Sequence, residues 1–192
     1  MPRRAVVLSF DDGYENFIEY ALPVLDECRF PSIVYAIAGM LGGHAQWLGA
    51  DGHAAPRLMD AAQLRDLAAH GVEIGSHSMH HLRLSHLPAA AQRAELSASR
   101  ECLADLLGRP VDHVCYPYGA HDEVTLQAAA DAGYRSGVTC QRGVATSAFD
   151  ALALPRKAVS RGDDLVGFLW KVYAKDAPKG QSLRREAIGA GT

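Results

Sequence analysis

The chain has 192 residues, of which 48% are hydrophobic and 21% are charged, as is ordinary for one compact domain with a sizeable core. Its net charge of −3 gives no electrostatic reason to expect a nucleic acid or an anionic membrane as a partner. We see no membrane span, and the apolar run after "MPRR" is too short for a signal peptide. The four cysteines form no Cys-x-x-Cys pair, so we expect reduced thiols and, if the chain is complete, a cytoplasmic protein.

Short β-rich runs alternate with longer helical patterns along the chain. Strands are predicted over residues 5–10, 32–38, 72–76, 112–119, 134–139 and 154–159. The strand over residues 112–119 runs into a turn. Helices are predicted over residues 15–28, with a break at Pro23, and over 61–70, 88–107, 122–133 and 163–174. A glycine-rich loop over residues 39–57 is long enough to carry function.

This alternation favours a parallel sheet with helices outside it. A complete eightfold β/α barrel usually needs about 250 residues. We therefore predict an α/β fold that forms a distorted, incomplete (β/α) barrel over residues 1–175. A polar, glycine-tipped tail over residues 176–192 is expected to fray. Phe168 and Trp170 lie at helical spacing with other apolar residues, and we expect them in the core.

Three polar motifs directly follow predicted strands. They are Asp11-Asp12-Gly13, the run "HSMHH" that begins at His77, and the run "YPYG" that begins at Tyr116. In a parallel barrel all three lie on the C-terminal face, where active sites of this architecture are built. Each motif alone is most often a turn, but their joint occurrence after strands of one pattern points to a functional site.

The residue types in these motifs favour a catalytic metal site. His77 and His81 are four residues apart, so both imidazoles reach one ion if the segment turns like a helix. One Asp and two His leave open coordination positions, as catalytic sites do, whereas structural zinc sites are closed by four protein ligands. The second Asp of the pair is then available as a base for a bound water.

The motifs resemble those of a known family. Residues 10–13 (FDDG), the pattern His77-Ser78-x-x-His81 and residues 116–119 (YPYG) are similar to the first three motifs of the polysaccharide deacetylases, carbohydrate esterase family four. That family includes chitin, peptidoglycan and poly-N-acetylglucosamine deacetylases. The resemblance implies the NodB-homology fold and a divalent metal, usually zinc, with cobalt or nickel as alternatives. The implied partner is an N-acetylated sugar, oligosaccharide or glycan intermediate.

Residue by residue, the resemblance assigns Asp12, His77 and His81 as metal ligands and Asp11 as the general base. The metal would polarise the acetamide carbonyl and acidify a water, whose proton Asp11 removes. The backbone N–H of Tyr118 would bind the resulting oxyanion.

Two departures from the family pattern are visible. Most members carry an Arg that pairs with the catalytic Asp at the position of Cys115, and we predict that Arg156 replaces it. Most members also use a C-terminal Leu-x-His as the acid, whereas no histidine follows His121. The general acid that protonates the leaving amine must then be another group. The candidates are His121, His44 and His53 of the glycine-rich loop, water and the metal-bound group, unless the acid is missing.

These residues leave several functions open. The first is a metal-dependent N-deacetylase of amino sugars. The alternatives are a catalytically weak, metal-binding relative that binds glycans and an amidohydrolase that acts on a non-sugar C–N bond. A non-haem iron oxygenase also uses two His and one carboxylate, but the order and spacing do not suit it. Trp47 in the glycine-rich loop either stacks on a sugar or covers the core edge.

Overall fold

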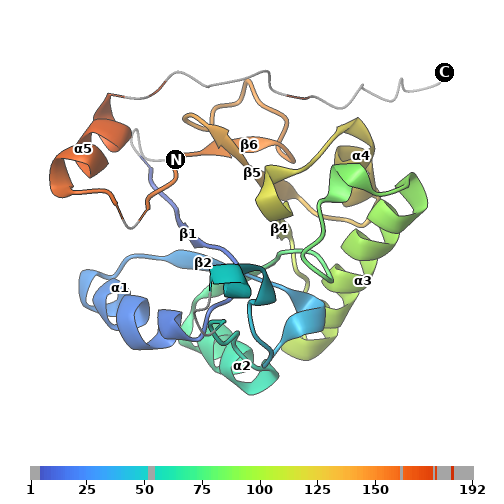
Figure 1. Ribbon diagram of the computed structural model, residues 1–192, viewed down its shortest axis with the longest axis horizontal. Helices are drawn as coiled ribbons and strands as arrows, with labels where there is room; N and C mark the ends of the chain where they lie inside the picture. Colours follow the sequence, from blue (N-terminus) through green and yellow to red (C-terminus); the bar gives the residue numbers. More distant parts are fainter. Residues whose placement is uncertain (1–4, 52–54, 161, 175, 177–182, 184–192) are drawn as a thin grey trace.

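The predicted incomplete barrel is confirmed. A computed structural model describes residues 5–51, 55–160, 162–174, 176 and 183 of the chain. Six parallel strands follow one another in chain order and curl into a half-barrel with helices outside (Figure 1). They are β1 (Leu8–Phe10), β2 (Ser32–Ala36), β3 (Glu73–Ser76), β4 (His113–Cys115), β5 (Ser136–Arg142) and β6 (Leu154–Arg156).

The helices lie where the sequence pattern predicts them. They are α1 (Leu22–Cys28), α2 (Ala61–His70), α3 (Ala89–Leu107), α4 (Glu123–Asp131) and α5 (Leu165–Tyr173). The break expected at Pro23 is a change of helix type, because the π-helical turn η1 (Phe17–Ala21) passes into α1 there. Four 3₁₀ turns complete the fold: η2 (Ala38–Met40), η3 (Gln46–Asp51), η4 (Leu84–His86) and η5 (Pro117–Gly119).

Local sequence signals fix the ends of α2. The side chain of Asp60 accepts a hydrogen bond from the backbone N–H of Gln63, and the Gln63 side chain accepts one from the backbone N–H of Asp60. This reciprocal capping box satisfies two N–H groups that a helix start leaves unpaired. Gly71 ends the helix at φ 101°, a conformation that favours glycine. Asp122 and Thr125 form the same kind of box at the start of α4.

Two apolar clusters lie on opposite faces of the sheet. The larger one joins the sheet to its helices and contains fully buried leucines from the helices that cover it: Leu64, Leu96, Leu103 and Leu126. The smaller one fills the inside of the curl with Ile33, Tyr35 and Cys115, against which Val138 packs. The inner layer is thin, and polar side chains of the strand ends complete it.

The last helix corrects one prediction. No residue of α5 is buried, and Phe168 and Trp170 are 39% and 60% exposed, so the expectation that they lie in the core is wrong. The sequence pattern correctly predicted an apolar helix, but not that this helix is left exposed. Polar contacts hold α5 in place, because Lys157 Nζ donates to the Val172 carbonyl and Lys171 Nζ to that of Ala158.

Most of the predicted tail, residues 177–182 and 184–192, lies outside the described residues, although Leu183 packs against the larger core cluster. No helix in the described part of the chain is long and apolar enough to cross a lipid bilayer. All four cysteines are free thiols.

Substitution of Gly137 tests how closely β5 and the chain before β6 pack. A Cβ atom at this position would lie 2.5 Å from the Leu152 carbonyl oxygen and 2.7 Å from the Tyr116 hydroxyl. Because that hydroxyl already donates to the same carbonyl, neither group can move freely. We expect Gly137→Ala to lower the free energy of unfolding in urea by about 1–3 kcal/mol. Gly162→Ala, where nothing lies within 4 Å, is the control. Equal unfolding midpoints for the wild type and Gly137→Ala would contradict this close packing.

Candidate active site

The adjacent carboxylates of Asp11 and Asp12 directly follow β1 and point to different partners. The chain turns sharply here, since Asp12 and Gly13 have φ values of 71° and 74°. A Cβ atom on Gly13 would touch the backbone of Ala36 at 3.4 Å, so the turn lies close against the end of β2. The repulsion between the two carboxylates is relieved by separate positive or hydrogen-bonding groups.

Asp12 meets both predicted imidazole ligands. Its Oδ1 atom lies 3.2 Å from His77 Nε2 and 3.2 Å from His81 Nε2. Both histidines are buried, with side-chain exposures of 3% and 6%. Burial alone would raise the pKa of Asp12, but hydrogen bonding with His77 and His81 outweighs it and holds that pKa well below 3.8. Burial and Asp12 together raise the pKa of Tyr14, whose phenol also contacts this carboxylate.

The orientation of His77 is set by its other ring nitrogen. His77 Nδ1 donates to the backbone carbonyl of Cys115 at 2.7 Å, so Nε2 faces Asp12, where it donates a proton to the carboxylate or, without that proton, can bind a metal ion. Burial lowers the pKa of His77, but Cys115 and Asp12 outweigh this and raise it well above 6.5. The pocket thus favours a positive charge at this place, whether a proton or a metal cation supplies it.

His81 reaches the site without a helix. Residues 77–83 form no helical turn, and Ser78 and His81 have φ values of 63° and 56°. The Ser78 hydroxyl accepts the backbone N–H of His81 at 3.1 Å, which stabilises this bend. The predicted convergence of the two imidazoles is therefore present, whereas the helical turn assumed for it is wrong.

The ring of His81 lies between two aromatic side chains. Trp47 is 4.1 Å and Tyr118 is 4.7 Å from it, centroid to centroid. Trp47 therefore packs on a site histidine, a role that neither of its two predicted alternatives included. His81 Nδ1 is buried and has no hydrogen-bond partner among the residues that the structure describes. The rings fix the plane of His81, so its Nε2 stays directed at Asp12.

Arg156 clamps Asp11 as predicted from the sequence. Its Nη1 and Nη2 donate to Asp11 Oδ1 and Oδ2 at 2.7 and 2.8 Å, a bidentate pair between residues 145 positions apart. The guanidinium also donates to Ser9 Oγ at 3.1 Å and to Cys115 Sγ at 3.2 Å. Burial would raise the pKa of Asp11, but Arg156 outweighs it and lowers that pKa.

Two groups of side chains place donor atoms close enough to hold one metal ion. They are Asp12 with His77 and His81, and Asp11 with His77 and Cys115, each with its atoms within 4.8 Å of one another. Arg156 already supplies positive charge to Asp11 and Cys115. Among the described residues no lysine or arginine pairs with Asp12, and the oxygen and two imidazole nitrogens of this group suit zinc. The donor set therefore fits a metal at Asp12.

A buried carboxylate that the sequence analysis missed supports the histidine loop. Glu95 on α3 accepts the backbone N–H groups of Met79 and His80 at 3.1 and 2.9 Å, and its other oxygen pairs with His80 Nδ1 at 2.6 Å. These contacts lie between the two site histidines in the chain. A charged residue in mid-helix carries no local signal for this contact, so the sequence alone could not have revealed it.

The proposed acids are not gathered at the carboxylates. His121 donates from Nδ1 to the Gly119 carbonyl at 2.8 Å and stacks on Tyr116, with its centroid 5.4 Å away. His44 is exposed and forms an isolated antiparallel β-bridge with Arg57. His53 lies outside the described residues. Neither described histidine has a contact with Asp11 or Asp12.

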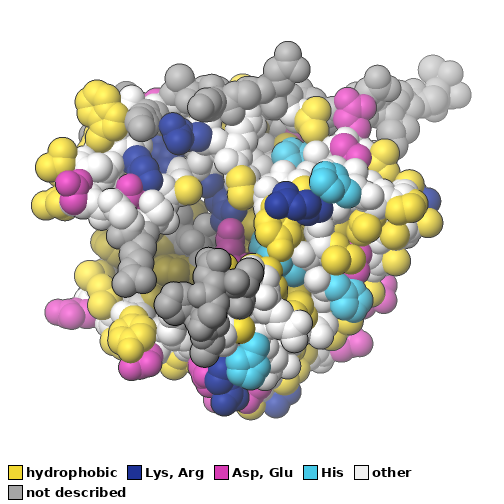
Figure 2. All heavy atoms as spheres, in the orientation of Figure 1, with side chains coloured by type: hydrophobic (Ala, Val, Ile, Leu, Met, Phe, Trp, Pro, Cys, Tyr) yellow, Lys and Arg dark blue, Asp and Glu magenta, His cyan; other side chains and the backbone are white. Residues whose placement is uncertain are grey.

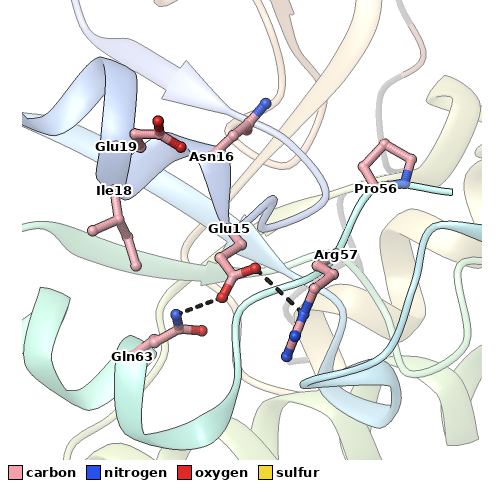
Figure 3. A pocket seen from close by; sticks show the side chains of 7 residues that line it. All are labelled: Glu15, Asn16, Ile18, Glu19, Pro56, Arg57 and Gln63. Atoms are coloured by element: carbon pink, nitrogen blue, oxygen red, sulfur yellow. Dashed lines mark hydrogen bonds and ion pairs between the residues drawn. The ribbon is translucent and has the colours of Figure 1, made fainter. Parts of the chain in front are cut away.

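The open face shows how charge is distributed around the site. In Figure 2, an acidic area near the centre lies directly below a basic one, with histidines to its right, and further basic side chains lie toward the upper left, on the side where Figure 1 places α5. A cavity of about 510 Å³ adjoins the chain after Asp12, and in it Glu15 lies between Gln63 at 3.0 Å and Arg57 at 3.4 Å (Figure 3).

The geometry agrees with comparisons to known proteins. A sequence profile described as polysaccharide deacetylase matches residues 1–137, and the chain belongs to that family. It is 31% identical over 159 residues to the Bacillus subtilis (strain 168) protein YxkH, a predicted polysaccharide deacetylase, with 83% of this chain and 53% of the relative covered. It is 24% identical over 168 residues to the poly-beta-1,6-N-acetyl-D-glucosamine N-deacetylase of Staphylococcus aureus (strain MRSA252), with 83% and 56% covered. The chain spans about half the length of the curated relatives it matches.

Solved structures share the fold. The Streptococcus pyogenes deacetylase PplD, solved with acetate, has a TM-score of 0.76 at 24% identity, and the match covers 90% of this chain and 72% of PplD. The deacetylase domain of BpsB from Bordetella bronchiseptica has a TM-score of 0.69 at 26% identity, with 81% and 71% covered. IcaB from Ammonifex degensii has a TM-score of 0.72 at 24% identity, with 84% and 70% covered. The resemblance in the motifs and the fold it implied are both confirmed.

Removing Glu95 tests whether this carboxylate orders the histidine loop. We expect Glu95→Ala to accelerate amide hydrogen exchange at Met79 and His80 by about tenfold or more, because each loses a hydrogen bond worth about 1.5–3 kcal/mol to a charged group. Glu101→Ala, an exposed position on the same helix, should leave both exchange rates unchanged. Unchanged rates in Glu95→Ala would show that the loop is held by its own backbone.

Proposed function

We propose that the protein is a metal-dependent hydrolase that removes N-acetyl groups from an amino-sugar-containing carbohydrate. One observation carries the proposal: Asp12 Oδ1 lies 3.2 Å from two buried imidazole nitrogens, while its neighbour Asp11 is held by Arg156. One carboxylate is thus free to bind a cation together with two histidines, and the other is kept ionised beside it. The substrate class is supported by the relatives named as deacetylases of N-acetylglucosamine polymers.

Asp12, His77 and His81 would hold the metal, and we propose zinc, since nitrogen and oxygen donors with an open position suit that ion. When bound, such an ion polarises a carbonyl and lowers the pKa of a bound water to about 7. His77 keeps the tautomer that this role needs through its bond to the Cys115 carbonyl, and Trp47 and Tyr118 hold the ring of His81.

Asp11 acts as the general base in this proposal. Arg156 holds both carboxylate oxygens, so the proton is accepted by a lone pair that the guanidinium does not occupy. Tyr118 adopts φ 57° and so turns the backbone of the third motif sharply next to His81. Its N–H is proposed to donate to the oxyanion that forms on the acetamide carbonyl. No hydrogen bond or ion pair in the described part of the chain joins His44 or His121 to Asp11 or Asp12, and we propose that the proton reaches the leaving amine from Asp11 or through water.

The decisive experiment measures acetate release from N-acetylglucosamine oligomers by metal-stripped protein reloaded with zinc, cobalt or nickel. We expect release only after reloading, and a loss of at least about 100-fold in Asp11→Asn, as is typical for removal of a general base. Asp12→Asn should instead weaken zinc binding, measured by competition with a chelator. Asp66→Asn, an exposed position on α2, is the control.

Zinc binding without acetate release from any acetylated sugar would contradict the proposed hydrolase activity. It would favour the alternative of a metal-binding relative that binds glycans. Release from simple acetanilides but not from sugars would favour the amidohydrolase of non-sugar substrates.

Arg156 gives a second test of the same site. We expect Arg156→Lys to lower kcat by about 10–100-fold with a smaller change in KM, because lysine cannot form the two parallel bonds that orient Asp11, each worth about 1.5–3 kcal/mol. Arg135→Lys, whose side chain is 79% exposed, is the matched control. Wild-type turnover in Arg156→Lys would show that Asp11 needs a positive charge but no fixed orientation.

A further inference from the structure

A second cavity, distinct from that of Figure 3, lies beside Arg156. Its volume is about 230 Å³, and it is lined by Cys140, Arg142, Arg156, Ala158 and Lys171. Arg142 and Arg156 are register partners at the ends of β5 and β6, so their side chains leave the sheet on the same face. The cavity therefore lies at the C-terminal end of the half-barrel.

This cavity adjoins two parts of the proposed active site. Its wall residue Arg156 holds Asp11. Another wall residue, Cys140, lies against the third motif, since a Cβ atom on Gly119 would be 2.7 Å from that of Cys140. A group bound in the cavity would consequently be a near neighbour of the acetamide that the site is proposed to cleave.

The charges on the walls have one sign. Three of the five lining residues are cationic and none is acidic. Arg156 is neutralised by Asp11, and Lys171 donates to Asp163 at 2.6 Å and to the Ala158 carbonyl at 3.0 Å. Arg142 forms no ion pair with any carboxylate in the described part of the chain. The cavity thus has an excess positive charge, which the guanidinium of Arg142 supplies.

The other cavity provides an internal comparison. Glu15, Glu19 and Arg57 line it, and Glu15 and Arg57 pair with each other, so its charges are mixed. The flank that follows Asp12 therefore suits a neutral sugar, whereas the flank beside Arg156 suits an anion. At about 230 Å³ the cationic cavity is also smaller than the roughly 300–1,000 Å³ usual for a whole small-molecule ligand. Its size fits a substituent better than an entire ligand.

We infer that the cavity binds an oxyanion, a carboxylate or a phosphate, that the substrate carries close to its N-acetyl group. Arg142 presents the planar fork that pairs with either oxyanion through two parallel hydrogen bonds, and Lys171 Nζ has a third N–H besides those that it donates to Asp163 and Ala158. This inference rests on the proposed function and narrows its substrate to anionic amino sugars. Arg142 is then a specificity-determining residue.

The test compares three sugars with the zinc-loaded full chain: N-acetylglucosamine, N-acetylmuramic acid with its carboxylate, and N-acetylglucosamine 6-phosphate. We expect kcat/KM to be at least about tenfold higher for one of the anionic sugars, and this preference to fall about tenfold in Arg142→Gln, as for loss of one charge-assisted pair. Lys171→Gln should lower it less. Arg93→Gln, which removes one exposed positive charge from α3, should leave both the preference and the rate unchanged. The better of the two anionic sugars identifies the oxyanion as a carboxylate or a phosphate.

A measurement without turnover separates this inference from the proposed function. Inorganic phosphate, titrated into the protein, should shift the backbone amide resonances of Gly119 and Cys140 in the wild type but not in Arg142→Gln. Phosphate binding without hydrolysis of any sugar would support oxyanion binding in the cavity and contradict the proposed deacetylase activity. Hydrolysis with equal kcat/KM for neutral and anionic sugars, and no shift of the amide resonances with phosphate, would contradict oxyanion binding in the cavity. The proposed deacetylase activity would then still stand.

Discussion

The bidentate pair between Arg156 and Asp11 is the interaction on which the site depends. It joins the last strand of the sheet to the first, over 145 residues, and so ties the two edges of a half-barrel that no further strand of the described residues closes. It also solves the problem raised by adjacent carboxylates. Asp11 is compensated by a guanidinium from β6, and Asp12 by imidazoles from the loop after β3. Because the compensating groups come from different elements, the two carboxylates can have different roles.

Backbone strain is concentrated in the same place. Five described residues other than glycine have positive φ, and four of them belong to the three motifs: Asp12, Ser78, His81 and Tyr118. Such conformations cost of order 1–3 kcal/mol each and persist only where the surroundings hold them. Here Glu95 holds the loop after β3, Ser78 caps His81, and Arg83 lies 4.1 Å over the Tyr118 ring. These turns bring the carboxylate of Asp12 and the imidazole of His81 together, which regular helices or strands could not do at these positions.

The sequence predicted those parts that depend on local pattern or on the geometry of parallel sheets. The capping box at Asp60 delimits α2 to the residue, and the position of each motif after a strand places it on one face. The Arg156 contact was also foreseen, because a missing charge at Cys115 required a substitute. Contacts between distant elements could not be foreseen: Glu95 reaches the histidine loop, Trp47 packs on His81, and α5 stays uncovered. These depend on three-dimensional packing, for which a helical or glycine-rich pattern contains no information.

In the proposed mechanism, the charge balance of the site gives each of the two carboxylates a role. With neutral imidazoles, Asp11, Asp12 and Arg156 together leave one negative charge, and a divalent ion at Asp12 would convert it into one positive charge. That balance matches the single negative charge that develops on an attacked carbonyl oxygen. Arg156 lowers the pKa of Asp11, which keeps the carboxylate ionised but makes it a weaker base. Such a base accepts a proton efficiently only from a water that has itself been acidified to a pKa of about 7. In the proposed mechanism, the clamp on Asp11 therefore depends on Asp12, one residue further, to bind the cation that acidifies the water.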